Sequence, residues 1–179
     1  EAAENYEAFI REFPKDELLP DAMYALGVSQ EAQKLSAEAQ STYAAFEGKF
    51  PQHPLLTEVR MRSAESLFAD RKFAEAQKLF SLVAAAKEFS LADTAMLRQG
   101  RCVYELGKYE DAGAIYWNVP REFPKTKSYD TAVLAGAKCY FFAGKYTLAR
   151  TGLENVAKRD VPEAAEASQW IGRSLPREN

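Results

Sequence analysis

The sequence predicts an all-α protein, a right-handed α–α superhelix or solenoid of about ten helices. Apolar residues recur at helical rather than strand spacing, which is the first reason. The second reason is a small residue, a tyrosine and a proline that recur at fixed offsets of four and then eight residues. These residues are Ala2, Tyr6 and Pro14, then Ala39, Tyr43 and Pro51, then Ala112, Tyr116 and Pro124. A glycine also precedes the small residue by twelve positions at Gly27 and at Gly100.

The repeat has a period of 35 to 37 residues, measured between the anchor residues Gly27, Ala64, Gly100, Ala137 and Gly172. Such a period is typical of solenoids in which each unit is a pair of helices. Ordering a unit costs about 1–2 kcal/mol of backbone entropy per residue. Burying one large apolar side chain returns only about 1.5–3 kcal/mol. We therefore expect a unit to be stable only when it is stacked on its neighbours.

Taken in order, the elements form a single predicted solenoid domain over residues 1–179. Residues 1–15 match the second half of a unit, and a terminal helix is expected over residues 164–175. Full helix pairs are predicted over residues 20–53, 57–90, 93–126 and 130–163. Because the chain begins with Glu1 and with half a unit, we expect it to be a piece of a longer or processed protein.

The turn and the packing inside each pair follow from a few residues. Gly107 and Gly144 can take the left-handed backbone conformation that ends a first helix, whereas Arg71 stands at this place in another unit. Small residues are expected where the two helices of a pair cross closely. Beside them we expect an aromatic ladder, covered by stacked helices and formed by Tyr6, Tyr43, Phe80 and Tyr116.

Three further residues carry local predictions. Pro120 removes a backbone donor inside a second helix, so we expect that helix to kink or to break near Asn118. Cys102 and Cys139 occupy equivalent places 37 residues apart. Neighbouring helices pack about 8–10 Å apart, whereas a disulfide needs Cα atoms within about 4.4–6.8 Å. Both cysteines should therefore be free, buried thiols.

These residues together resemble the tetratricopeptide-repeat family, whose unit is a helix pair with this small, small, aromatic and proline pattern. The resemblance extends over almost the whole chain. The run Tyr-x-x-Phe-x-x-x-Phe-Pro from Tyr43 to Pro51 further resembles bacterial envelope repeat proteins. Examples are the outer-membrane-protein assembly lipoprotein and the periplasmic coordinator of the Tol–Pal system. This second resemblance favours the periplasm or the cell envelope, with the cytoplasm as the alternative.

No catalytic constellation is recognisable in the sequence, so we expect neither an enzyme nor a cofactor nor a metal site. His53 is the only histidine, which excludes a site with several histidine ligands. It precedes Pro54 at a helix entrance, where we expect a surface or capping role. No stretch of about 18 apolar residues predicts membrane insertion. The formal net charge of -3 does not favour nucleic acid as a partner.

The family resemblance implies a partner-binding groove lined by the first helices of successive units. A protein or peptide is the implied partner. By offset from the anchors, this predicted groove contains Tyr24, Glu31, Met61, Glu65, Phe68, Leu97, Arg101, Tyr104, Glu105, Leu134, Lys138, Phe141, Phe142 and Arg173. The equivalent residues Phe68, Tyr104 and Phe141 form an aromatic rib. These three rings either anchor a partner or pack as framework, and the sequence leaves both interpretations open.

Charge is distributed unevenly along the chain. Residues 1–89 carry a net charge of -5, while residues 90–179 carry a net charge of +2. A partner of opposite polarity would be steered into register by this difference. The sequence therefore favours a non-catalytic adaptor that binds a peptide or helix in the groove. The alternative is a self-assembling segment of a larger envelope complex or enzyme, with homo-oligomers formed through the terminal helices near Tyr6 and Trp170.

Overall fold

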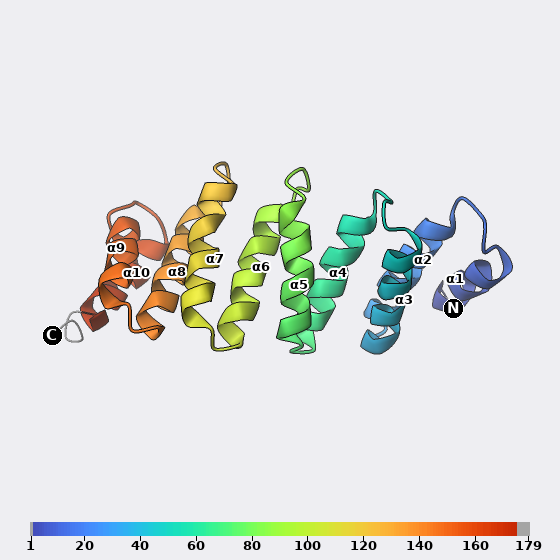
Figure 1. Ribbon diagram of the computed structural model, residues 1–179, viewed down its shortest axis with the longest axis horizontal. Helices are drawn as coiled ribbons and strands as arrows, with labels where there is room; N and C mark the ends of the chain where they lie inside the picture. Colours follow the sequence, from blue (N-terminus) through green and yellow to red (C-terminus); the bar gives the residue numbers. More distant parts are fainter. Residues whose placement is uncertain (1, 175–179) are drawn as a thin grey trace. The chain divides into compact units, whose positions relative to one another are not determined.

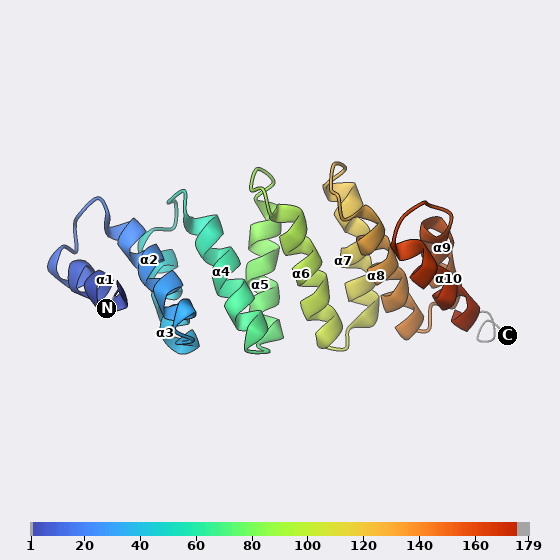
Figure 2. The same cartoon turned by 180° about the vertical axis from the view of Figure 1, so that it is seen from behind.

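The computed structural model describes residues 2–174, which form ten α-helices and no strand. Figures 1 and 2 show each helix joined to the next by a short turn. This confirms the predicted all-α fold and the predicted number of helices. The helices are α1 (Ala2–Glu12), α2 (Leu19–Ala32), α3 (Ser36–Lys49), α4 (Leu56–Ala69), α5 (Phe73–Ala85), α6 (Ala92–Glu105), α7 (Tyr109–Glu122), α8 (Tyr129–Phe142), α9 (Tyr146–Ala157) and α10 (Glu163–Ser174).

The chain divides into two compact units, one over residues 1–89 with α1 to α5 and one over residues 90–179 with α6 to α10. Within each unit, every helix packs against the helix that follows it in the sequence. The even-numbered helices α2, α4, α6 and α8 are the first helices of their pairs, and α10 is a first helix whose anchor is Gly172. A single solenoid domain over the whole chain stays a prediction.

A left-handed residue ends the first helix of every pair. Gly107 and Gly144 both have a φ of 74°, as their place in the sequence predicts. Lys34 and Arg71 take the same conformation in the first unit, with φ values of 62° and 61°. In each case the next backbone N–H donates to the carbonyl five residues earlier, as from Leu35 N to Gln30 O at 2.9 Å. This hydrogen bond satisfies a carbonyl that the helix end would otherwise leave unpaired.

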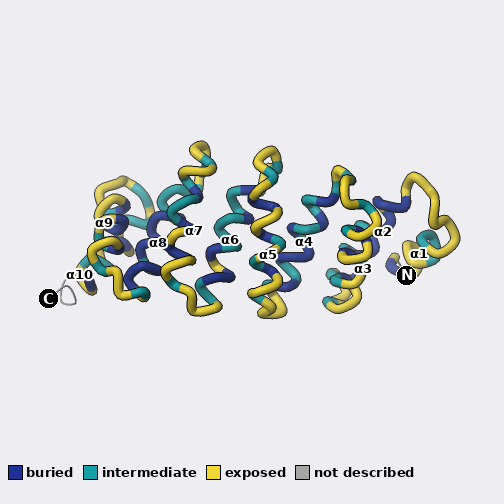
Figure 3. The backbone as a smooth tube through the Cα atoms, viewed as in Figure 1, coloured by how far each residue is buried: buried dark blue, intermediate teal, exposed yellow. Residues whose placement is uncertain are grey.

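Close approach of the paired helices depends on the predicted small residues. Ala39, Ala64, Ala76, Ala112, Ala137 and Ala149 are all completely buried. A Cβ added at Gly27 would collide with the ring of Tyr43, and one added at Gly100 would lie 3.1 Å from the ring of Tyr116. Figure 3 shows buried residues where helices face one another, while the turns that join them are largely exposed.

The aromatic ladder is covered at three of its four positions. Tyr43, Phe80 and Tyr116 are 1%, 0% and 8% exposed. Tyr6 is 36% exposed, so the expectation that it is covered on both sides is wrong. The physical reason is that α1 packs against α2, and no described first helix lies on its other side.

The local predictions have mixed outcomes. Helix α7 runs through Asn118 and Pro120 to Glu122, so the predicted break does not occur. Pro120 lies in the last turn, where the missing N–H removes only one late hydrogen bond. Cys102 and Cys139 are buried and free of disulfides, as expected. Nδ1 of His53 accepts a hydrogen bond from the N–H of Leu55 at 3.2 Å, in the turn that leads into α4. No side chain caps the first turn of α4, so the capping alternative for His53 is wrong.

Candidate functional site

The residues of the predicted groove lie on α2 and α4 of the first unit and on α6, α8 and α10 of the second. Their exposure divides them into three groups. Buried within the helix packing are Met61, Leu134 and Phe141. Half-buried are Tyr24, Glu31, Glu65, Phe68, Leu97, Tyr104, Glu105 and Lys138. The exposed members are Arg101, Phe142 and Arg173. The whole set is therefore a mixture of framework and accessible surface.

In the first unit, Arg62 on α4 has three polar partners, of which Tyr24 and Glu31 lie on α2. Its Nε donates to the hydroxyl oxygen of Tyr24 at 2.9 Å, and its Nη1 donates to Glu31 at 3.1 Å. Its Nε also lies 3.4 Å from Glu58 Oε1. Burial lowers the pKa of Arg62, but the hydrogen bonds with Tyr24 and Glu31 outweigh it, and the net pKa is raised. Sequence reasoning missed Arg62, although its spacing of four from Glu58 is a usable signal.

Each ring of the aromatic rib contacts one ring of its own helix pair. Phe68 contacts Phe73, Tyr104 contacts Tyr109, and Phe141 contacts Tyr146, each pair with ring centroids 5.3 Å apart. In every pair the second ring belongs to the first residue of the following helix. The rib rings therefore hold the two helices of a pair together. The structure supports their framework role, while a further role in partner binding stays a prediction.

In the second unit an aromatic chain crosses the three first helices. It consists of Tyr104 on α6, Phe142 on α8 and Trp170 on α10. The centroid of Phe142 lies 6.0 Å from that of Tyr104 and 5.6 Å from that of Trp170. Phe142 is 44% exposed, so the middle ring of this chain is accessible to solvent. The sequence places Trp170 in a terminal helix for self-association and not in the groove, since its offset differs from that of the predicted set.

Cations lie over the outer rings of this aromatic chain. The guanidinium of Arg101 lies 5.2 Å from the ring centroid of Tyr104. The ring of Trp170 has Lys138 Nζ at 5.4 Å and the guanidinium of Arg173 at 4.9 Å. These distances are within the range of cation–π attraction. The predicted residues Arg101, Lys138 and Arg173 therefore lie beside aromatic rings of the second unit.

Two of these cations also form ion pairs. Arg101 pairs with Glu105 at 2.6 Å, and Lys138 pairs with Glu166 at 2.7 Å. Glu166 also accepts a hydrogen bond from the indole N–H of Trp170 at 3.3 Å. The hydrogen bond from Lys138 lowers the pKa of Glu166, so this carboxylate is charged at neutral pH. The ion pairs hold the cations beside the rings.

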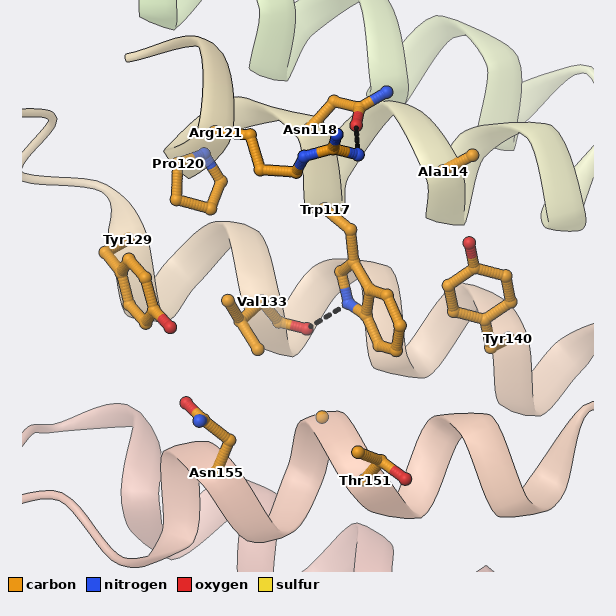
Figure 4. A pocket seen from close by; sticks show the side chains of 11 residues that line it. Ala114, Trp117, Asn118, Pro120, Arg121, Tyr129, Val133, Tyr140, Thr151 and Asn155 are labelled. Carbon is orange, nitrogen blue, oxygen red and sulfur yellow. Dashed lines mark hydrogen bonds between the residues drawn. The ribbon is translucent and has the colours of Figure 1, made fainter. Parts of the chain in front are cut away.

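A separate cavity of about 620 Å³ lies among α7, α8 and α9 of the second unit. We call it the Trp117 pocket, after the side chain at its centre (Figure 4). The indole N–H of Trp117 donates to the carbonyl of Val133 at 3.2 Å. The pocket is lined by Ala114, Trp117, Asn118, Pro120, Arg121, Tyr129, Val133, Tyr140, Thr151, Gly152 and Asn155. Sequence reasoning missed this pocket, because its residues come from three helices.

Within residues 2–174, no group of three or more His, Cys, Asp or Glu side chains could hold a metal ion. Over the same described residues, none of the helices combines the length and the apolar character needed to span a bilayer. The titratable groups with shifted pKa values include Cys139, whose thiol pKa is raised by burial to about 11. A thiol with a raised pKa is a poor nucleophile at neutral pH, which is consistent with a structural cysteine.

Two family models, both for the tetratricopeptide repeat, match the chain over residues 21–53 and residues 61–124. Together these segments make up more than half of the 179 residues. The chain therefore belongs to the tetratricopeptide-repeat proteins. Proteins of this family generally mediate interactions between proteins and are typically not catalysts.

Solved structures with the same fold come from several organisms. A tetratricopeptide repeat protein from Parabacteroides merdae is 17% identical with a TM-score of 0.68, covering 98% of this chain and 69% of that one. The nearly identical TPR-like repeats from Podosopora anserina, described as those of a kinesin light chain, are 19% identical with a TM-score of 0.65. That match covers 86% of this chain and 83% of the other. BtubC (BKLC) from P. vanneervenii is 13% identical with a TM-score of 0.65, covering 99% and 80%. A comparison with curated proteins found no match.

Proposed function

We propose that the chain is a non-catalytic adaptor that binds a peptide or helix of another protein on the first helices of its second unit. The observation that carries this proposal is the aromatic chain of Tyr104, Phe142 and Trp170, with its exposed central ring and its flanking cations. Aromatic and arginine side chains dominate the binding energy of protein interfaces. Family membership adds that proteins of this class generally bind other proteins.

The chemistry of this surface indicates the kind of partner. Phe142 offers an apolar contact between two rings that carry cations, Arg101 over Tyr104 and Lys138 and Arg173 over Trp170. Arg101 and Lys138 are each paired with a carboxylate that an acidic partner side chain would compete with. Residues 90–179 carry 13 basic and 11 acidic side chains, a net charge of +2. A segment with an apolar anchor flanked by acidic residues is complementary to this surface. A protein rather than a nucleic acid is the proposed partner, because the positive charge is small.

The test uses peptides selected from a random display library on the intact chain. We expect selected peptides to share an apolar residue flanked by Asp or Glu. Phe142→Ala should weaken their binding by about 1–2 kcal/mol, roughly five- to thirtyfold. Leu148→Ala is the matched control, because Leu148 is 40% exposed on α9 of the same unit, away from the aromatic chain. Equal binding of Phe142→Ala and wild type would contradict the proposal.

Self-association is a second candidate function, favoured by one specific observation. Tyr6 on α1 is equivalent to Tyr43 and Tyr116, which pack against Gly27 and Gly100 of their own helix pairs. No such glycine covers Tyr6 among the described residues, and it is 36% exposed. Gly172 on α10 is an anchor glycine with nothing within 4 Å of a Cβ placed there. Another copy could supply α10 to cover Tyr6, which would generate a head-to-tail contact. A molar mass by light scattering that stays monomeric at all concentrations would refute this candidate.

The proposed location is the bacterial periplasm or cell envelope, within a larger assembly. The run from Tyr43 to Pro51 is its support. Fractionation of cells that produce the parent protein tests the proposal. Recovery in the cytoplasmic fraction alone would contradict it.

A further inference from the structure

The Trp117 pocket differs from the corresponding place in the first unit, where polar side chains join the helices across the gap. There Arg60 pairs with Glu47 at 2.6 Å. Ser63 Oγ donates to Gln40 Oε1 at 2.8 Å, and Gln40 Nε2 donates to the carbonyl of Ser63 at 3.0 Å. The remaining cavity is about 400 Å³, and Leu79 forms part of its lining. At the equivalent positions the second unit has Val133 for Arg60 and Gly152 for Leu79, so neither the ion pair nor the leucine is present.

Two glycines make room for the indole of Trp117. A Cβ added at Gly136 on α8 would collide with the indole, and one at Gly152 on α9 would lie 2.8 Å from it. The equivalent of Trp117 in the first unit is Ala44. Glycine inside a helix costs about 1 kcal/mol relative to alanine. The placement of the indole therefore depends on residues that are unfavourable for the helices that carry them.

Aromatic rings and a proline form the apolar part of the pocket. Figure 4 shows Tyr129, Val133 and Tyr140 on α8, with the indole of Trp117 reaching down beside them. The rings of Trp117 and Tyr140 are in contact, with centroids 4.6 Å apart. Pro120 contributes to the wall on the α7 side. Grooves lined by such rings are the usual binding sites for proline-rich segments in the polyproline II conformation.

The polar part of the lining supplies hydrogen-bond donors. Nη1 of Arg121 donates to Oδ1 of Asn118 at 3.1 Å, which leaves the amide NH₂ of Asn118 to act as a donor. Asn155 stands on the opposite wall, on α9. The lining contains no carboxylate. A proline-rich segment matches this arrangement, because proline has a carbonyl acceptor but no backbone N–H that would need an acceptor in the pocket.

We propose that the Trp117 pocket binds a proline-rich peptide segment in the polyproline II conformation. Its volume of about 620 Å³ lies within the range of about 300–1,000 Å³ that is usual for ligand sites. Proline rings pack against the half-buried Trp117 and Tyr129, while Tyr140 is buried and supports the indole from behind. Peptide carbonyls accept hydrogen bonds from Asn118 and Asn155. The pocket shares no residue with the aromatic chain on α6, α8 and α10. The proposal for this pocket can therefore fail without affecting the proposed adaptor surface, and the reverse also holds.

The experiment measures binding to the intact chain by fluorescence of Trp117. The chain has two tryptophans, so a Trp170→Phe background leaves Trp117 as the reporter. The probe is an acetylated and amidated oligoproline peptide. A peptide of equal length with alternate prolines replaced by alanine restores N–H groups and loosens the polyproline II conformation. A malto-oligosaccharide tests whether the pocket takes a sugar instead. We expect saturable binding of oligoproline, with weaker binding of the alanine-containing peptide and none of the sugar.

Two variants at exposed positions locate the site without disturbing the core. Asn155→Leu introduces leucine, the residue found at the equivalent position 82 of the first unit. It should weaken oligoproline binding about three- to tenfold through loss of one hydrogen bond. Ala114→Arg should abolish binding by filling the mouth of the pocket. Leu82→Asn is the matched control in the first unit and should leave binding unchanged. Equal binding of both peptides, binding of the sugar alone, or full binding by Asn155→Leu or Ala114→Arg would overturn the proposal.

Discussion

The left-handed residue at the end of each first helix is glycine in the second unit but a charged residue in the first. Lys34 and Arg71 have φ values of 62° and 61°, against 74° for Gly107 and Gly144. In this conformation the Cβ of an L-residue lies too close to the following carbonyl oxygen, which costs about 1–2 kcal/mol. We predict that Lys34→Gly raises the free energy of unfolding of the first unit.

The expected gain is smaller than the strain that is removed. Glycine also increases the entropy of the unfolded chain, which offsets about 0.5–1 kcal/mol. The net gain for Lys34→Gly is therefore about 0.5–1 kcal/mol. The guanidinium of Arg71 lies 5.9 Å from the ring centroid of Phe73, and an exposed cation–π contact is worth about 0.5–1 kcal/mol. Arg71→Gly should therefore gain less than Lys34→Gly, and Gly107→Ala should lose about 1 kcal/mol.

Urea denaturation followed by circular dichroism measures these differences. The midpoint should rise for Lys34→Gly while the m-value stays constant, since the exposed surface is unchanged. Ala45→Gly is the control, because Ala45 is exposed inside α3 and glycine there should cost about 1 kcal/mol. A lower midpoint for Lys34→Gly, or a higher one for Gly107→Ala, would refute the argument that conformational strain decides the sign.

Two further predictions follow from the packing and the burial. Gly27→Ala should lower the free energy of unfolding by about 1–3 kcal/mol, because its Cβ would collide with the ring of Tyr43. Gly172→Ala has open space around its Cβ, so it should be neutral or gain up to about 1 kcal/mol. Urea denaturation midpoints compare the two variants. Burial raises the pKa of the Cys139 thiol from 9.0 to about 11, so the unfolded chain loses this proton first. The stability that this thiol contributes is complete below about pH 9 and is lost as the pH rises to about 11. Cys139→Ala should flatten the fall of unfolding free energy across that window, and an unchanged slope would contradict the assignment.

The fold could be predicted from the sequence because the repeat imposes the same local chemistry many times. The offset from Gly27 to Tyr43 recurs from Gly100 to Tyr116, and both glycines approach their ring closely in the structure. Gly107 and Gly144 likewise take the left-handed conformation that their place predicts. The exposure of Tyr6 escaped prediction, since offsets identify a ladder position but not whether a helix covers it.

The candidate site could be predicted only in part. Offsets place a residue on one face of its helix, and Arg101, Phe142 and Arg173 are exposed. They cannot show how deeply the next helix covers that face, and Phe141 is only 6% exposed beneath the ring of Trp170. The Trp117 pocket was beyond sequence reasoning for a related reason. Its indole lies against glycines that are 19 and 35 residues away in the sequence.

The same repeat thus carries two kinds of contact between its helices. In the first unit the helices are joined by polar groups, as in the network of Arg62 and in the hydrogen bond from Ser36 Oγ to Asp70 at 2.9 Å. In the second unit ring contacts are added to such polar pairs, as in the contact of Phe142 with Trp170 beside the ion pair of Lys138 with Glu166. Half-exposed ion pairs contribute at most about 1 kcal/mol and weaken with salt, whereas ring contacts do not depend on salt in this way. If a partner binds the second unit, added salt should weaken the part of its binding energy that comes from the cations. The part that comes from contact with Phe142 should change little with ionic strength.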